Sequence, residues 1–464
     1  MRSLSLALAV AFGLGVAGSA SAELAVRNVQ DGMLAVSAGG TPYVAYLQGN
    51  GLEIAVRRGG AWKRMHAARV TRGSTLAALK AVRQGPVVLV RGAGSHSLDL
   101  VRRTRAGWRR IPIARAPTGS KLGWPGLVLE RGNAVIAFTR WRGATHKTAL
   151  MLARIDLRGR AHSVQITGSG FPKSFVAPPA VPVLAGRTVR VIESYGSDGA
   201  VGTIEWRPQN GTWKGQYIDA GYGDFPVGPL LGAVGGNAVY AAWTQALLGA
   251  GELPVSLAKH GRSIESDFVL DRAIMTGFGL TRTGPEVAAN EWVSAGDLGL
   301  TGDDVVWAGV VVNRRVDFEL DGWLAGLASA PRGTRDLLLA RPDGLSWYRL
   351  PRPPSVHIDL DATEQLNGSV LVTGDVRGAS GAVRLYRERP GAPRELAGSA
   401  PLAADGSFTF LDTPSIGPFV YRAVYTDRFT RLPYSTLLRH PIASSSDLSS
   451  PDLSTDPQVW CGKC

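Results

Sequence analysis

Aromatic and acidic residues occur together in two short segments near the middle of the chain. Tyr195 precedes Asp198 by three residues, and Tyr222 precedes Asp224 by two, with glycine beside each acid. Aromatic side chains offer broad apolar faces for stacking, and glycoside hydrolysis uses two carboxyl groups roughly 5–10 Å apart. We therefore take Tyr195, Asp198, Tyr222 and Asp224 as candidate ligand-binding residues and assign no catalytic residue.

Further carboxylates in this part of the chain would suit the same chemistry if the fold brought them together. Solvated turn positions are the simpler interpretation of each of them. The seven His form no H-E-x-x-H cluster, and no G-x-S-x-G, P-loop or dinucleotide-binding glycine motif is present. The sequence thus predicts no metal site and no cofactor. The further acids are Glu193, Glu286, Glu291, Asp303 and Asp304.

The two cysteines of the chain, Cys461 and Cys464, lie in the string Trp460-Cys461-Gly462-Lys463-Cys464. The string resembles the W-C-G-x-C motif of thioredoxins, which implies thiol–disulfide exchange. That chemistry accompanies a βαβ pattern, whereas strands precede the motif here. We predict a local disulfide between Cys461 and Cys464, with intermolecular bridges, a redox role or a partial metal site as alternatives.

The elements that must position the candidate residues follow a repeat. Leu52–Arg58 turns at Gly59-Gly60 into a strand opened by Trp62, and 46 residues later Leu98–Arg103 leads in the same way to Trp108. Further copies place equivalent positions near residues 161, 213 and 264, at intervals of 51 to 53, and then at 347. The last interval of about 83 predicts an insertion within 280–330. We interpret the recurring Trp as packing between units.

Each unit also contains an earlier apolar strand, so it offers three or four short strands joined by Gly, Asn or Asp turns. Such a unit buries both faces only by stacking on its neighbours, and a period of 40–50 residues of strands favours a β-propeller. We predict an all-β protein with a six-bladed propeller over residues 23–351, with five or seven blades as alternatives. A set of β-sandwiches with similar hairpins is the competing interpretation.

The repeat supports a family resemblance. Units that end in a Gly turn followed by Trp and a basic residue, as at Trp62-Lys63 and Trp108-Arg109, resemble the exported sialidase-like (BNR-type) six-bladed propellers. The S-x-D-x-G-x-x-W box of that family is absent at Trp62, Trp108, Trp213 and Trp347. The resemblance implies an exported propeller in which a hydrolytic site would gather acids and aromatic residues from several blades at the channel mouth.

The pattern changes after the propeller. Residues 352–354 are the expected linker, and residues 355–442 predict a small antiparallel β-sandwich. Asp405-Gly406-Ser407-Phe408 and Tyr421–Tyr425 resemble bacterial immunoglobulin-like or fibronectin-like modules, which implies a spacing or presenting role. Residues 443–464 are rich in Ser and Asp before the terminal Cys pair, so they predict a flexible tail.

The N-terminus predicts export. Arg2, the apolar run Leu4–Val16 and the small residues Ala20-Ser21-Ala22 form a signal peptide over residues 1–22, cleaved after Ala22. An uncleaved anchor is the alternative. No later segment has the ~18 uninterrupted apolar residues of a span, so the mature chain is expected to be secreted and free of the membrane.

The net charge of +14 comes from 51 basic and 37 acidic residues, and 43 of the basic residues are Arg. They are scattered rather than gathered in a basic block, so we predict no specific nucleic-acid partner. The sequence therefore favours an exported, non-catalytic binding or cell-surface scaffold whose propeller loops engage a glycan or a protein. A sialidase-like propeller glycoside hydrolase is the alternative, and no oligomeric state is predicted.

Overall fold

The computed structural model of the chain describes residues 23–442, except for gaps at 30, 83, 168–173, 175, 198–199, 223–224, 247–254, 262–263, 271–272, 282–283, 296–299, 310–313, 319–322, 330–333, 351–355, 390–391, 393, 415–418, 427–432 and 439–441. The expected signal peptide 1–22, the linker 352–354 and the tail 443–464 with Cys461 and Cys464 lie outside the described residues.

The described elements are β-strands and two short 3₁₀ turns at Ala93–Ser95 and Gly143–Thr145, which confirms the all-β prediction. Antiparallel sheets of four or five strands follow one another along the chain as blades of a propeller. The strands of blades 1 to 4 are, in order, β2 (Gly32–Val36), β3 (Pro42–Gln48), β4 (Gly51–Arg58), β5 (Ala61–Arg69); β6 (Thr75–Val82), β7 (Gly85–Arg91), β8 (Ser97–Thr104), β9 (Gly107–Arg115); β10 (Ser120–Leu122) with β11 (Gly126–Glu130), β12 (Asn133–Arg142), β13 (Lys147–Ile155), β14 (Ala161–Gln165); and β15 (Ala180–Ala185), β16 (Thr188–Ser197), β17 (Ala200–Gln209), β18 (Thr212–Tyr222).

Three further blades complete the ring. Their strands are β19 (Phe225–Gly235), β20 (Ala238–Ala246), β21 (Val255–His260), β22 (Ile264–Leu270); β23 (Ala273–Thr281), β24 (Gly284–Ala295), β25 (Leu300–Gly309), β26 (Arg314–Phe318); and β27 (Trp323–Ser329), β28 (Arg335–Arg341), β29 (Gly344–Leu350), β1 (Glu23–Arg27). The described residues thus form seven blades, within the predicted range of five to seven and one more than the favoured six. The insertion expected within 280–330 is part of the repeat instead, because β24, β25 and β26 belong to blade 6 and β27 begins blade 7.

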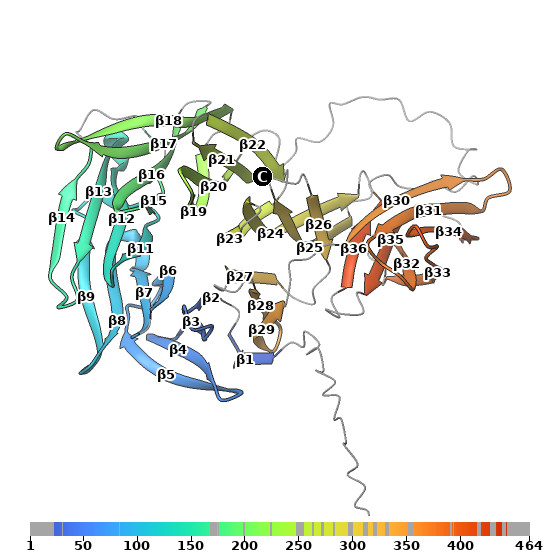
Figure 1. Cartoon of the computed structure of the whole chain (residues 1–464), viewed down its shortest axis with the longest axis horizontal. Helices are drawn as coiled ribbons and strands as arrows, with labels where there is room; N and C mark the ends of the chain where they lie inside the picture. Colours follow the sequence, from blue (N-terminus) through green and yellow to red (C-terminus); the bar gives the residue numbers. More distant parts are fainter. Residues whose placement is uncertain are drawn as a thin grey trace, which may run out of the picture.

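The ring closes through its N-terminal strand. β1 pairs with β29 as the outermost strand of blade 7, so the first and last parts of the propeller share one sheet. Gly344 pairs with Arg27 in a backbone conformation with φ +141°, and a Cβ there would collide with the carbonyl oxygen of Val26. The inner strands of successive blades neighbour one another around the centre, and β27 of blade 7 lies beside β2 of blade 1 (Figure 1). This closure leaves the propeller without a free seam.

The recurring Trp residues pack between blades, as predicted. Trp347 is buried together with Leu338 of blade 7 and Val44 of blade 1, and Trp62 meets Trp347 edge to face at 5.9 Å between ring centroids. The sequence repeat predicts that Trp347 occupies a position equivalent to Trp62 and Trp108, which lie on the outer strands β5 and β9. It lies instead on β29, the third strand of its blade, because β1 supplies the outer strand.

Tight turns join the outer strands of the blades. Between β17 and β18, Asn210 and Gly211 have φ values of +51° and +78°, which a two-residue hairpin of type I′ requires. The repeated Gly and Asn positions in the sequence are therefore turn positions between strands of one blade.

After the propeller, two sheets pack on a shared core. One contains β30 (His357–Glu364), β31 (Val370–Arg377) and β34 (Ser407–Asp412), and the other contains β32 (Ala382–Glu388), β33 (Glu395–Pro401), β35 (Val420–Thr426) and β36 (Pro433–Leu437). Phe318 of β26 pairs with Tyr434 of β36, and the core of these sheets continues into blade 7 through Leu324, Leu337 and Leu350. The sheets therefore lean on the last two blades (Figure 1).

Candidate functional site

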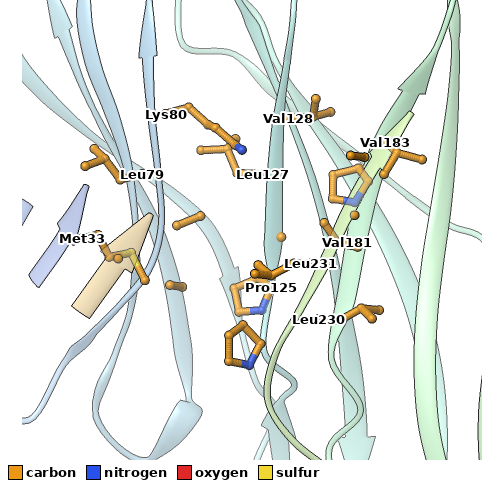
Figure 2. A pocket seen from close by; sticks show the side chains of 18 of the residues that line it. Met33, Leu79, Lys80, Pro125, Leu127, Val128, Val181, Val183, Leu230 and Leu231 are labelled. Carbon is orange, nitrogen blue, oxygen red and sulfur yellow. The ribbon is translucent and has the colours of Figure 1, made fainter. Parts of the chain in front are cut away.

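The inner strands of the propeller enclose a central channel with a cavity of about 370 Å³. Its described wall comes from β2, β6, β11, β15, β19 and β27, which are spread over most of the propeller sequence. Ala, Val, Leu, Pro and Gly make up nearly all of it, and Figure 2 shows that the lining residues come from several strands. The labelled residues of that view are Met33, Leu79, Lys80, Pro125, Leu127, Val128, Val181, Val183, Leu230 and Leu231.

Small residues let the inner strands approach closely. A Cβ at Gly126 of β11 would lie 2.6 Å from the Cα of Val181, and one at Gly232 of β19 would lie 2.8 Å from a methyl group of Val183. Glycine within a strand commonly marks such a close approach of two backbones. The width of the channel is therefore set in part by these two positions.

Lys80 is the charged residue of the described channel wall. It lies on β6, two residues before the end of the strand, and its side chain is exposed to the channel. Among the described residues Lys80 has no side-chain hydrogen bond and no ion pair. The residues packed around Lys80 partly desolvate its ammonium group, which lowers its pKa. Sequence reasoning missed this residue, although a single Lys inside the apolar segment Leu76–Val82 was a usable signal.

The described buried carboxylates lie elsewhere, between blades, and Glu205 of β17 has the most partners. Its Oε1 accepts hydrogen bonds from Arg190 Nη1 at 2.9 Å and Arg207 Nε at 2.8 Å, and its Oε2 lies against His260 Nδ1. Glu205 is fully buried, and His260 belongs to β21 of the next blade. Burial raises the pKa of Glu205, but Arg207 and His260 outweigh this effect and hold the pKa below its usual value. This cluster joins blades 4 and 5 electrostatically.

Two other buried acids have similar partners. Asp99 Oδ2 pairs with Arg110 Nη2 at 2.7 Å. Asp336 Oδ1 accepts from Trp347 Nε1 at 2.9 Å and from Arg349 Nε at 2.8 Å. Each of these carboxylates is thus engaged in a structural contact within or between blades.

Glu193 of β16 lies on the opposite face of blade 4 from Glu205. The register places Glu205 opposite Ile192, so Glu193 and Glu205 point to different faces of one sheet. The partner of Glu193 is Trp206, whose Nε1 donates to Oε2 at 3.2 Å. Burial raises the pKa of Glu193 to about 7. It is a carboxyl group that the fold keeps protonated in mildly acidic solution.

The structure describes two of the four predicted ligand-binding residues. Tyr195 is half-buried on β16, where its ring covers Gly202 and meets Tyr217 edge to face at 6.3 Å. Burial, together with Tyr217 and Glu193, raises the pKa of Tyr195. Tyr222 ends β18, two strands away from Tyr195 in the same sheet. Asp198 and Asp224 lie outside the described residues.

Of the other acids considered from the sequence, two become neighbours in the backbone register. Glu291 of β24 stands directly opposite Asp304 of β25, while Asp303 stands opposite Trp292 and Glu286 opposite Gly309. Directly opposed positions in an antiparallel pair have Cβ atoms about 4.5–5.5 Å apart. The register of blade 6 thus places one pair of predicted candidates at opposed positions of two consecutive strands.

Neither a cluster of metal ligands nor a membrane-spanning helix is found in the described part of the chain. No group of three or more His, Cys, Asp or Glu residues is placed to hold a metal ion there. Within the same residues there is no helix with the length and apolar character needed to cross a membrane.

No protein-family model and no curated protein matches the chain. Among solved structures it is similar to prolyl oligopeptidase B from Galerina marginata, at 9% identity over 76% of this chain and 56% of that one, with a TM-score of 0.40. It is also similar to the β-propeller domain of the trilobed protease from Pyrococcus furiosus (8% identity, 69% of this chain, 94% of that one, TM-score 0.42). A third similar structure is the GH74 enzyme of Niastella koreensis (12% identity, 89% of this chain, 73% of that one, TM-score 0.44). The chain spans 54% to 58% of the length of the first three peptidases it matches.

Proposed function

We propose that the mature protein is an exported, non-catalytic binding scaffold, in which the propeller presents loops to a glycan or a cell-surface protein. The observation that carries the proposal is the placement of the acids. The described buried carboxylates of the blades, Glu193, Glu205, Asp99 and Asp336, are bonded to Trp or Arg neighbours, and no carboxylate is among the described residues of the channel wall. A rigid closed ring with its acids engaged in packing suits recognition better than acid–base catalysis.

In this proposal the two sheets after the propeller form an immunoglobulin-like or fibronectin-like module that spaces the propeller from its attachment. Their core is continuous with blade 7, so the module would hold the propeller in a fixed orientation relative to itself. The signal peptide would be removed after Ala22, and Cys461 and Cys464 would close a disulfide in the exported chain.

A glycoside hydrolase is the second candidate function, and the register of blade 6 is the observation that favours it. Glu291 and Asp304 are opposed across β24 and β25, and retaining glycosidases use two carboxyl groups about 5–5.5 Å apart. An enzyme of this kind would use these two residues as acid/base and nucleophile.

A glycan array read twice, for binding and for cleaved product, separates the two functions. The mature chain from Glu23 is compared with the variant Glu291→Gln/Asp304→Asn. We expect glycan binding that both proteins share and no product from either. Release of new reducing ends by the unaltered chain, lost in the double variant, would replace the scaffold by the hydrolase.

The export part of the proposal has its own test. Protein secreted without reductant should begin at Glu23 and should take up no alkylating reagent at Cys461 or Cys464, as measured by intact-mass spectrometry. Two alkylated cysteines would refute the disulfide, and retention of residues 1–22 would refute cleavage.

A further inference from the structure

We propose that the central channel binds a small anionic amphiphile, with a carboxylate head paired to Lys80 and an unbranched apolar tail along the channel. The site is distinct from the loops proposed to engage a glycan or protein. It is formed by strands from six blades and exists only in the closed ring.

The channel wall determines the apolar part of the ligand. A cavity of about 370 Å³ lies in the range of small-molecule sites, which are mostly apolar with a few placed polar groups. Leu34, Leu79, Leu127, Val183 and Leu230 contribute to this wall. Moving a hydrocarbon chain from water against it is favourable by roughly 25 cal/mol per Å² of apolar surface buried.

Lys80 determines the charge of the ligand. Lys80 is the charged residue of the described wall, and it has no anionic partner among the described residues. A carboxylate would supply the missing partner, and a charge-assisted hydrogen bond of this kind is among the stronger ones. The net charge of +14 also raises the local concentration of anions around the protein.

The position of Lys80 orients the ligand. Lys80 is close to the end of β6, so the head group would lie toward the face of the ring that carries the β6–β7 turn. Figure 2 shows Lys80 and Val128 toward one end of the view, and Pro125 and Leu230 toward the other. The tail would therefore extend from Lys80 past Leu127 toward Pro125 and Leu230.

Isothermal titration of the full mature chain with decanoate, below its micelle-forming concentration, tests the proposal. Decanol and decylammonium provide the same tail without the negative charge. We expect decanoate to bind at least about tenfold more tightly than decanol, and decylammonium to bind more weakly than either.

The matched variants are Lys80→Met, which keeps the length and apolar stem of the side chain, and Lys63→Met, which removes an exposed lysine from β5. Lys80→Met should weaken decanoate binding at least about tenfold while leaving decanol unchanged, and Lys63→Met should change neither. Undetectable decanoate binding, or equal affinity for decanoate in Lys80→Met and the unaltered chain, would overturn the site. Glycan binding by the loops is read separately with the same variants, so loss of one function is distinguishable from loss of the other.

Discussion

Two regions of the ring hold charged side chains in opposite ways. Between blades 4 and 5, Glu205 is surrounded by Arg190, Arg207 and His260, and its pKa is held below the usual value. In the channel, Lys80 is surrounded by apolar residues and has no ion pair among the described residues. Its pKa is also lowered, but for an amine this shift disfavours the charged form. Desolvation opposes charge at both positions, and among the described residues only the first region supplies compensating partners.

The difference separates structural charge from charge free to act. The cluster at Glu205 joins two blades, so its partners are already used in holding the ring together. Lys80 contributes nothing comparable to the fold and retains its full capacity for an incoming anion. The channel is therefore a better candidate for a ligand site than the acids between the blades.

The largest expected effect comes from removing the centre of the inter-blade cluster. Glu205→Ala would leave the guanidinium groups of Arg190 and Arg207 without their shared carboxylate, so we expect a loss of about 3–5 kcal/mol in the free energy of unfolding. Urea unfolding followed by intrinsic fluorescence measures it. The control is Glu130→Ala. Glu130 Oε2 pairs with Nη1 of the half-exposed Arg154 at 2.7 Å, so loss of this surface ion pair should cost less than about 1 kcal/mol. Equal midpoints for the two variants would contradict the structural role of Glu205.

Glu193→Gln is expected to have a smaller effect that depends on pH. The folded pKa of Glu193, about 7, is above the unfolded value of 4.5, so the folded state binds the extra proton between these values. Stability should therefore fall as pH rises from 4.5 to 7, by about 3 kcal/mol in total, and then stay level. The amide keeps an acceptor for Trp206 and does not titrate, so the variant should match the unaltered chain near pH 4.5 and exceed its stability at pH 8. Unfolding curves at several pH values measure this, and a difference independent of pH would refute it.

The smallest effect is expected at Lys80 in the absence of ligand. The lowered pKa means that the folded state disfavours the charged amine, so Lys80→Met should slightly raise the urea midpoint at pH 7. The gain should fade toward high pH, where the amine of the unaltered chain is neutral in both states. A marked destabilisation by Lys80→Met would show that Lys80 is a structural group like those around Glu205.

Much of the fold could be predicted from the sequence, because strand alternation, Gly turns and the spacing of Trp62 and Trp108 are local signals. The count of blades could not be predicted as well. Blade 6 lacks a Trp at the start of its outer strand, and the outer strand of blade 7 comes from the other end of the chain as β1. The sequence carries no local sign of a pairing between residues 23–27 and 344–347.

The candidate sites were less predictable for the same reason. The contact between Glu205 and His260 joins residues 55 positions apart on different blades. The opposition of Glu291 and Asp304 depends on the register between β24 and β25, which alternation along either strand does not specify. Lys80 stands in an apolar strand that alone could face either a core or a channel, and only ring closure decides which.

The most direct test of the contrast between paired and unpaired charge is the titration of the lysine amines. The chain has eight Lys, and ¹³C-dimethylation makes each visible by NMR, with Lys80→Met assigning the signal of Lys80. We expect the Lys80 signal to have a titration midpoint at a lower pH than the signals of the other lysines. Addition of decanoate should shift this midpoint to a higher pH. Titration of Lys80 together with the exposed lysines, unchanged by decanoate, would contradict the account.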